Sequence, residues 1–302
     1  MPKVDIFPTP KVKYTKENGV IAIDTNASPI HLAVAEVSKT GELLSYQTIS
    51  LHHLLGLSQN NKDHQEWILA HQIVDLAIQK GRAIAIENLK KLKKGYRGDG
   101  KATLRKILHN WNAKKFLQKL KRVAMLKGVE VVEVNPAHTS IIGMLKYAPQ
   151  LSIDKDIAGA YVIGRRALGF KEDMPENYEK LLKDRAYLEF ALKRYEEREK
   201  ELTELIEKES NGYKRNALES ELRSVEKAKE LLANFIQSLQ SEPSSCKGAY
   251  GRNPAWQVLR VALLFPTLGK VLPRDLSPLK PLLVEGVWDG DGPDKGFLKQ
   301  PL

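Results

Sequence analysis

Short apolar runs separated by polar breaks dominate the first fifty residues. Residues 19–26 (GVIAIDTN) and 30–37 (IHLAVAEV) are rich in β-branched and aliphatic side chains, and a turn-forming stretch lies between them. A third run, residues 43–51 (LLSYQTISL), follows a Thr-Gly pair. Apolar, β-branched runs bounded by turn-forming residues are typical of strands. The pattern therefore predicts a meander of three successive strands joined by tight connections.

Further along the chain, helical and strand-like patterns alternate. Apolar residues recur at helical spacing over residues 63–79. Residues 83–89 (AIAIENL) and 129–136 (VEVVEVNP) have the pattern of strands, and residues 101–127 between them predict a basic amphipathic helix or helix pair. A short helix rich in small residues follows at residues 157–169 (IAGAYVIGRRALG). This order of elements predicts a mixed sheet with helices on its faces, an α/β fold.

The second half of the chain has a different pattern. Residues 175–240 carry leucines at helical spacing among many charges, and a break at residues 210–212 predicts a helical hairpin. The last part holds eight of the fifteen prolines, which predicts an extended or partly disordered tail. We therefore expect three parts: an α/β domain over residues 1–170, a charged helical hairpin over residues 171–240, and a proline-rich extension over residues 241–302.

Composition limits the classes of protein to which this chain can belong. Cys246 is the single cysteine among 302 residues, which excludes an internal disulfide and a cysteine-based zinc site. No stretch approaches the ~20 consecutive apolar residues of a membrane span, and residues 1–16 lack the apolar centre of a signal peptide. The histidines show no spacing typical of a nucleophile or of metal ligands. We therefore expect a cytoplasmic protein with no membrane partner.

Positive charge is concentrated in residues 88–127, although the whole chain is basic, with a net charge of +11. That segment contains fourteen Lys or Arg against one acidic residue, whereas residues 171–230 mix fourteen basic with seventeen acidic residues. Basic side chains on a helix neutralise phosphates, so we predict a polyanionic partner such as a nucleic acid. The alternative is a solvated, lysine-rich helix pair. The residues predicted to contact nucleic acid are Lys90, Lys91, Lys93, Lys94, Arg97, Lys101, Arg105, Lys114 and Lys115, together with Arg165 and Arg166 in the following helix.

Three acidic residues occupy positions where a charge is costly. Asp24 lies within the first apolar run, Glu87 lies near the end of the fourth strand, and Asp156 begins the helix after the fifth. A buried carboxylate loses several kcal/mol of solvation unless it is paired or binds a cation. If the first and fourth strands are neighbours, the three carboxylates meet. They would then bind Mg²⁺ or Mn²⁺, which prefer oxygen ligands.

Each of these acids also has a simpler explanation. Asp24 can cap a turn, Glu87 can be exposed where its strand ends, and Asp156 can be an ordinary acid in the first turn of a helix. Taken together, the three acids predict a catalytic, metal-binding site. Two divalent ions at such a site activate a water and stabilise the leaving oxygen in phosphodiester cleavage.

The succession of these segments resembles the RuvC-like nuclease domain of TnpB transposon-associated proteins and their type V CRISPR relatives. The resemblance runs over residues 18–170 and rests on AIDTN, AIENLKKL, WNAKKFLQKLKRVAMLKGVEVVEVNPAHTS and DKDIAGAYVIGRRALG. It implies an RNase H-like fold in which Asp24, Glu87 and Asp156 are the catalytic acids. It also implies Mg²⁺-dependent cleavage of DNA in a transposition system, a guide RNA as a second partner, and a location at the nucleoid of a prokaryotic cell.

The chain departs from that family in three places. The four cysteines of the family's zinc ribbon are missing, and residues 141–155 predict a short loop instead, so we expect no zinc. The asparagine expected two residues after the third acid is Ala158. Asp154 competes with Asp156 for the position of the third acid, and we prefer Asp156 because the small residues that the family pattern implies follow it. We also expect no counterpart of the guide-binding domains that precede the first strand in the family. Two alternatives therefore stay open: a protein that binds DNA or RNA without cleaving it, and a subunit whose protein partner docks on residues 175–240 and supplies guide binding.

Overall fold

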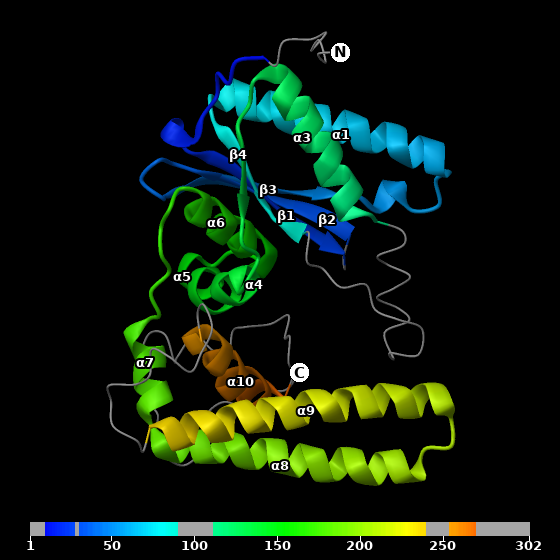
Figure 1. Cartoon of the computed structure of the whole chain (residues 1–302), viewed down its shortest axis with the longest axis vertical. Coiled ribbons are helices and arrows are strands. Elements are labelled where there is room, and N and C mark those ends of the chain that lie inside the picture. The colour runs from blue at the N-terminus through cyan, green and yellow to red at the C-terminus, as the bar shows by residue number, and fades with distance from the viewer. Residues whose placement is uncertain (1–9, 28–29, 90–110, 240–253, 270–302) are drawn as a thin grey trace, which may run out of the picture. The chain divides into compact units, whose positions relative to one another are not determined.

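The computed structural model of the chain describes residues 10–27, 30–89, 111–239 and 254–269 (Figure 1). The chain divides into two compact units. The first runs to Glu172 and holds the sheet, and the second holds residues 144–152 and the helices that follow Asp173.

A five-stranded mixed sheet is the centre of the first unit. Its strands are β1 (Val20–Ala27), β2 (Ile30–Val37), β3 (Leu43–Ser50), β4 (Ala83–Glu87) and β5 (Val131–Val134). Their order across the sheet is β3-β2-β1-β4-β5. Strands β1, β2 and β3 pair in antiparallel fashion, whereas β4 runs parallel to β1 and β5 runs parallel to β4. The predicted meander and the predicted α/β class are therefore confirmed.

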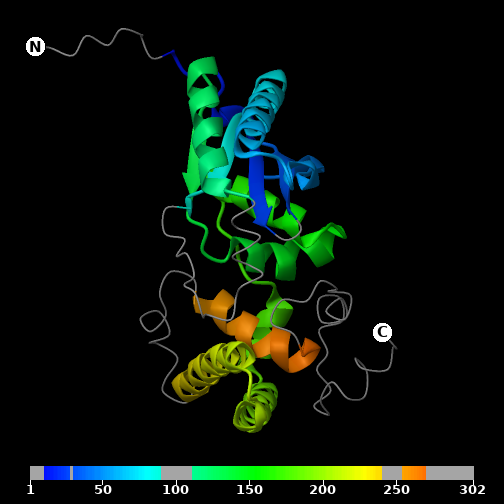
Figure 2. The same cartoon turned by 90° about the vertical axis from the view of Figure 1, so that its right-hand side faces the viewer.

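Helices cover both faces of this sheet. Figures 1 and 2 show α1 (Gln59–Lys80) and α3 (Ala113–Lys127) on one face and α6 (Lys155–Ala167) on the other. The short helices η1 (Lys16–Asn18) and η2 (His52–Leu54) lie in connections. Each of these three long helices corresponds to a helical pattern in the sequence.

Capping residues explain where the helices of the first face begin and end. The Ser58 hydroxyl accepts a hydrogen bond from a backbone N–H of the first turn of α1, and Asn112 does the same for α3. Both helices end at a glycine in the left-handed conformation, Gly81 with φ 65° and Gly128 with φ 72°. A glycine adopts this conformation without steric cost and lets the last carbonyls of the helix find partners.

Residues 139–151 are helical, so the predicted short loop over residues 141–155 is wrong. They form α4 (Thr139–Ile142), the π-helical turn η4 (Gly143–Tyr147) and α5 (Ala148–Leu151). Most of their apolar side chains are buried, Ile142 and Leu145 among them. A buried segment must pair its backbone N–H and C=O groups, and helical turns do so locally.

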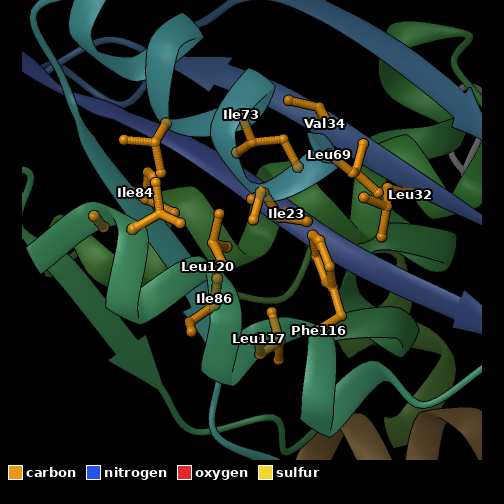
Figure 3. Close-up of a cluster of buried hydrophobic side chains, with 14 of the residues drawn as sticks. Ile23, Leu32, Val34, Leu69, Ile73, Ile84, Ile86, Phe116, Leu117 and Leu120 are labelled. Atoms are coloured by element: carbon orange, nitrogen blue, oxygen red, sulfur yellow. The ribbon is translucent and has the colours of Figure 1, made fainter. Parts of the chain in front are cut away.

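Alternate residues of β1 face opposite sides of the sheet. Ile21 and Ile23 join a buried cluster with α1 and α3, part of which is drawn in Figure 3. Ala22 faces α6, because a Cβ added to Gly164 would lie 3.0 Å from the Ala22 Cβ. Since side chains alternate along a strand with a period of two, Asp24 belongs to the α6 face. The buried cluster also contains Leu32, Val34, Ile84 and Ile86 from neighbouring strands, Leu69 and Ile73 from α1, and Phe116, Leu117 and Leu120 from α3.

The second unit contains a pair of long helices. They are α8 (Arg185–Lys208) and α9 (Gly212–Ser238), preceded by α7 (Glu176–Lys183). The predicted helical hairpin is therefore confirmed, and its break lies at residues 209–211, one residue earlier than predicted. None of the helices in the described ranges combines the length and the apolar character needed to cross a membrane.

A further helix, α10 (Pro254–Leu268), crosses this pair (Figure 2). The Tyr187 hydroxyl donates to the Ala262 carbonyl and the Tyr195 hydroxyl to the Val261 carbonyl, both at 2.9 Å. The expectation of an extended tail is therefore wrong for residues 254–268. The many prolines of this part of the sequence drew attention away from one apolar run. That run is long enough to form a helix, and the helix is buried against α8 and α9. A protein partner docking on residues 175–240 stays a prediction.

Candidate functional site

Asp24 and Glu87 lie on neighbouring parallel strands at the same end of the sheet. The register pairs Ile23 of β1 with Ile86 of β4, so each acid is the next residue along its own strand. Asp24 is buried, with 8% of its surface exposed. The sequence-based condition for a shared site, that the first and fourth strands be neighbours, is thus met.

The surrounding protein compensates the charge of Asp24 only in part. Burial raises the pKa of Asp24 well above its ordinary value, and the negative charges of Glu87 and Asp156 raise it further. The Lys155 ammonium and a hydrogen bond from the Thr25 backbone N–H lower the pKa of Asp24, but they do not offset the burial. The three predicted acids therefore lie close enough to act on one another electrostatically.

Helix α6 comes close to Asp24 because residue 159 is a glycine. A Cβ at Gly159 would lie 2.8 Å from the Oδ2 atom of Asp24. Asp156 precedes Gly159 by three residues, and residues three apart share one face of an α-helix. Asp156 and Gly159 therefore lie on the same face of α6, the face that packs against Asp24 of β1.

Asp154 and Asp156 have different roles at the start of α6. Asp154 is the N-cap residue, and its Oδ1 atom accepts a hydrogen bond from the Asp156 backbone N–H at 2.8 Å. The Asp156 side chain is largely buried between two basic groups: His31 Nε2 lies 3.2 Å from its Oδ2 atom, and Lys155 Nζ lies 2.5 Å from its Oδ1 atom. This geometry favours Asp156 over Asp154 as the third acid of the site.

Glu87 is held by the segment that follows β5. Burial raises the pKa of Glu87, while a hydrogen bond from the Thr139 hydroxyl and the positive charge of Arg166 act against that rise. Arg166 also donates to the backbone carbonyls of Asn135 and Ala137, the second at 2.9 Å. Arg166 therefore connects α6 to the β5–α4 segment and places a positive charge beside Glu87.

The three carboxylates offer the oxygen ligands that Mg²⁺ and Mn²⁺ prefer. Their burial and mutual repulsion leave negative charge that a divalent cation would neutralise. Across the described ranges, no group of three acidic, histidine or cysteine side chains stands close enough together to hold a metal ion as these side chains are placed. The Asp156 carboxylate is instead shared between His31 and Lys155. The site therefore suits a divalent cation in residue type and charge, and binding requires the Asp156 side chain to change partners.

The basic residues predicted to contact nucleic acid fall into three groups. Lys90, Lys91, Lys93, Lys94, Arg97, Lys101 and Arg105 lie outside the described residues. Lys114 and Lys115 are exposed in the first turn of α3. For these residues, contact with nucleic acid stays a prediction.

Arg165 and Arg166 form the third group, and both make contacts inside the first unit. Arg165 donates to Glu172 at 2.6 Å and to the Gly41 carbonyl at 2.8 Å, and its guanidinium lies over the Phe170 ring. Arg166 is bound to the β5–α4 segment as described above. These contacts give both arginines a structural role, and a contact with nucleic acid stays a prediction for each.

Two residues of this site were not predicted from the sequence, His31 and Lys155. The sequence signal for His31 is that it lies in the apolar run over residues 30–37. The structure buries all eight residues of this run, which form β2. The tight hairpin pairs His31 with Asn26, two residues beyond Asp24, and so brings it to the acidic end of the sheet. Lys155 adjoins Asp156 in sequence, but its contact with the carboxylate depends on side-chain direction, which spacing alone does not predict.

Comparison with known proteins points to a different family from the one that the sequence resembles. Residues 139–240 match the model of a family described as an uncharacterized protein conserved in archaea (DUF2192). The match is not to a nuclease family, so the resemblance to TnpB-like proteins is wrong. No curated protein matches the chain. A guide RNA and a link to transposition were implied by that resemblance alone, so neither is carried forward.

Proposed function

We propose that the first unit is an RNase H-like nuclease that cleaves DNA with the help of divalent cations. The strand order β3-β2-β1-β4-β5, with an antiparallel meander followed by two strands parallel to β1, agrees with that fold. The central strand carries one acid, its parallel neighbour ends in a second, and a helix on one face begins with a third. Fold alone does not define an activity, so the proposal depends on these side chains.

One observation carries this proposal: the buried Asp24 carboxylate lies beside Glu87 at the end of two neighbouring strands, and the surrounding protein compensates its charge only in part. Keeping such a charge lowers the stability of the fold, because a buried carboxylate loses its hydration. Titratable groups with perturbed pKa values cluster at functional sites. A site that binds a cation explains why three acids are placed together at the end of two neighbouring strands.

The chain's own residues would bind the cations and orient the substrate. Asp24, Glu87 and Asp156 would supply the oxygen ligands, and divalent ions bound by them would activate a water and stabilise the leaving oxygen of the phosphodiester. Thr139 fixes the direction of the Glu87 carboxylate through its hydroxyl group. Arg166 places a positive charge near the same carboxylate.

The proposed substrate follows from the distribution of basic residues. Lys114 and Lys115 are exposed on α3, and the chain carries a net charge of +11. Lysines of this kind bind the phosphate backbone with little regard to base sequence. We propose DNA as the substrate, with RNA as an alternative that the same assay distinguishes.

A cleavage assay with matched variants tests this proposal. The wild type is incubated with labelled single-stranded DNA, duplex DNA and RNA in Mg²⁺, in Mn²⁺ and in a chelator, beside Asp24→Asn and Glu87→Gln. We expect cleavage by the wild type with either cation, and a loss of about 10²-fold or more in both variants, since each removes a ligand of the proposed metal site. Products that persist unchanged in Asp24→Asn would contradict the proposal.

A second candidate is a protein of the same fold that binds nucleic acid without cleaving it. The observation that favours it is the Lys155–Asp156 contact, which already supplies the third acid with a positive partner. Thermal unfolding of the wild type with and without Mn²⁺ separates the two candidates. Stabilisation by Mn²⁺ that disappears in Asp24→Asn favours the nuclease, and DNA binding without any effect of Mn²⁺ favours the second candidate.

A further inference from the structure

The two oxygens of Asp156 have partners of different kinds. His31, on β2, contacts Oδ2 at 3.2 Å, and its side chain is 8% exposed. Lys155, on the first turn of α6, contacts Oδ1 at 2.5 Å, and its side chain is 32% exposed. One partner is a short side chain buried in the sheet, and the other is a long, flexible side chain at the surface.

His31 is held in place by the strands around it. All eight residues of β2 are buried, and β2 pairs with β1 on one side and β3 on the other. An imidazole has few rotatable bonds, so a ring packed there presents its Nε2 atom in a fixed direction. His31 therefore restrains Oδ2 of Asp156 and leaves Oδ1 as the oxygen that can change partner.

Lys155 occupies the place of a cation among the acids. Its ammonium contacts Oδ1 of Asp156, and its positive charge also acts on Asp24. A lysine side chain is flexible and partly exposed here, so it can move toward solvent when another cation arrives. A metal ion bound by Asp24 and Asp156 would compete with this ammonium for the same oxygen.

We propose that His31 is a positioning residue for the metal site, and that Lys155 is a built-in competitor which neutralises Asp156 until a divalent cation displaces it. This inference rests on the proposed function, because it assigns roles at the same carboxylates. It makes a prediction that a purely structural role for the two residues does not: removing His31 and removing Lys155 must change the metal affinity in opposite directions.

For His31, the reason is pre-organisation of the ligand. Groups that orient a metal ligand by a hydrogen bond, without touching the metal, typically change the metal affinity by about 10–100-fold when they are removed. His31→Ala frees the Asp156 carboxylate to rotate, so we expect Mn²⁺ to bind about 10–100-fold more weakly. In His31→Gln the amide nitrogen can replace Nε2 as a donor to Oδ2, so we expect the affinity to return most of the way to that of the wild type.

For Lys155, the reason is competition. Lys155→Met keeps most of the aliphatic length and removes the ammonium, so a cation no longer has to displace a charge from Oδ1 of Asp156. We therefore expect Mn²⁺ to bind several-fold more tightly to Lys155→Met than to the wild type. His71→Ala, at an exposed position of α1, is the matched histidine control and should leave the affinity unchanged.

Isothermal titration calorimetry of the full-length chain with Mn²⁺ alone, all variants at one pH, tests the inference. Thermal unfolding in a chelator shows that each variant is folded. If His31→Ala does not fold, Lys155→Met, at a partly exposed position, still tests the inference. Wild-type affinity in both His31 variants would overturn the positioning role. Weaker binding by Lys155→Met would overturn the competition.

The same titration distinguishes this inference from the proposed function. A wild type that binds no Mn²⁺ would overturn both, because no metal site would then exist. A wild type that binds Mn²⁺ but cleaves no nucleic acid would overturn the nuclease proposal, while the opposite effects of the His31 and Lys155 variants would still support the inference.

Discussion

Gly159 leaves the space that the Asp24 carboxylate occupies: a Cβ on Gly159 would lie 2.8 Å from Oδ2 of Asp24. The glycine belongs to α6, and the aspartate belongs to the central strand of the sheet. This close approach brings Asp156, one turn earlier in α6, to the same end of the sheet as Asp24 and Glu87. The spacing of the three acids therefore depends on one residue without a side chain.

The variant Gly159→Ala should weaken metal binding and leave the free energy of unfolding nearly unchanged. The added methyl group displaces the Asp24 carboxylate, whereas replacing glycine by alanine within a helix favours the helix by about 1 kcal/mol. We expect Mn²⁺ affinity, measured by calorimetry, to fall by about 10-fold or more, and the free energy of unfolding to change by less than about 1 kcal/mol. Gly212→Ala, at the start of α9 with open space around it, is the control. Equal metal affinity in both variants would contradict the prediction.

Asp24→Asn should stabilise the metal-free protein. The substitution removes a buried charge whose hydration is lost, and an amide of the same shape keeps the packing. We expect the free energy of unfolding in a chelator to rise by roughly 1–3 kcal/mol in urea denaturation. Asp75→Asn, at an exposed position of α1, is the control; it removes an exposed ion pair with Lys127 and should lower the free energy of unfolding by less than about 1 kcal/mol. A destabilised Asp24→Asn would show that the protein itself compensates the charge of Asp24.

The gain from Asp24→Asn should depend on pH. The pKa of Asp24 is raised in the folded protein above its ordinary value of 3.8, so the folded state binds this proton more tightly than the unfolded state. The resulting stability is present at low pH and is lost as the pH rises through the raised pKa. We therefore expect the gain to be small near the ordinary pKa of an aspartate and to grow toward neutral pH, in urea titrations of both proteins at each pH.

Glu36, a carboxylate with a shifted pKa outside the acidic site, does not obscure that test. Burial alone would raise the pKa of Glu36, but hydrogen bonds from Ser45, Lys80 and Arg82 hold it below its ordinary value. Its contribution therefore has the opposite sign and is lost as the pH falls. It is present in both proteins, so the difference between wild type and variant removes it. A gain that stays constant over the whole pH range would contradict the assignment to Asp24.

Arg166→Met should destabilise the first unit. The guanidinium donates to the carbonyls of Asn135 and Ala137, and hydrogen bonds to charged groups contribute about 1.5–3 kcal/mol each. We expect a loss of about 3 kcal/mol or more in urea denaturation, with Arg122→Met on the exposed side of α3 as the control. Unchanged stability combined with weaker DNA binding would instead favour the predicted contact between Arg166 and nucleic acid.

Replacing Lys114 and Lys115 by glutamine should weaken DNA binding in a salt-dependent manner. Each lysine that neutralises a phosphate adds about one to the slope of log affinity against log salt concentration. We expect the magnitude of that slope to be smaller by about two in the double variant, measured by fluorescence anisotropy with labelled duplex DNA. The control is the double replacement of Lys193 and Lys200, which are exposed on α8. An equal change in the control would mean that binding reports net charge rather than the α3 surface.

The secondary structure could be predicted from the sequence wherever the apolar residues of a segment followed one spacing, either the alternation of a strand or the spacing of a helix. Residues 30–37 form β2 and residues 157–167 lie within α6, because alternation and helical spacing are local properties of the chain. The two wrong predictions, the loop over residues 141–155 and the extended tail over residues 254–268, have one cause. In both segments, helix-breaking or turn-forming residues lie beside apolar side chains, and tertiary burial decided the conformation.

The sequence by itself determined that three acids occupy unusual positions, because a carboxylate in an apolar strand stands out against its neighbours. Only the tertiary structure decided which groups surround them: the parallel register of β1 and β4 brings Glu87 beside Asp24, the cap of α6 takes Asp154, and His31 reaches Asp156 from β2. The physical reason is that hydrophobic periodicity records whether a side chain is buried. Its neighbours depend on strand order and register, which join residues distant in the sequence.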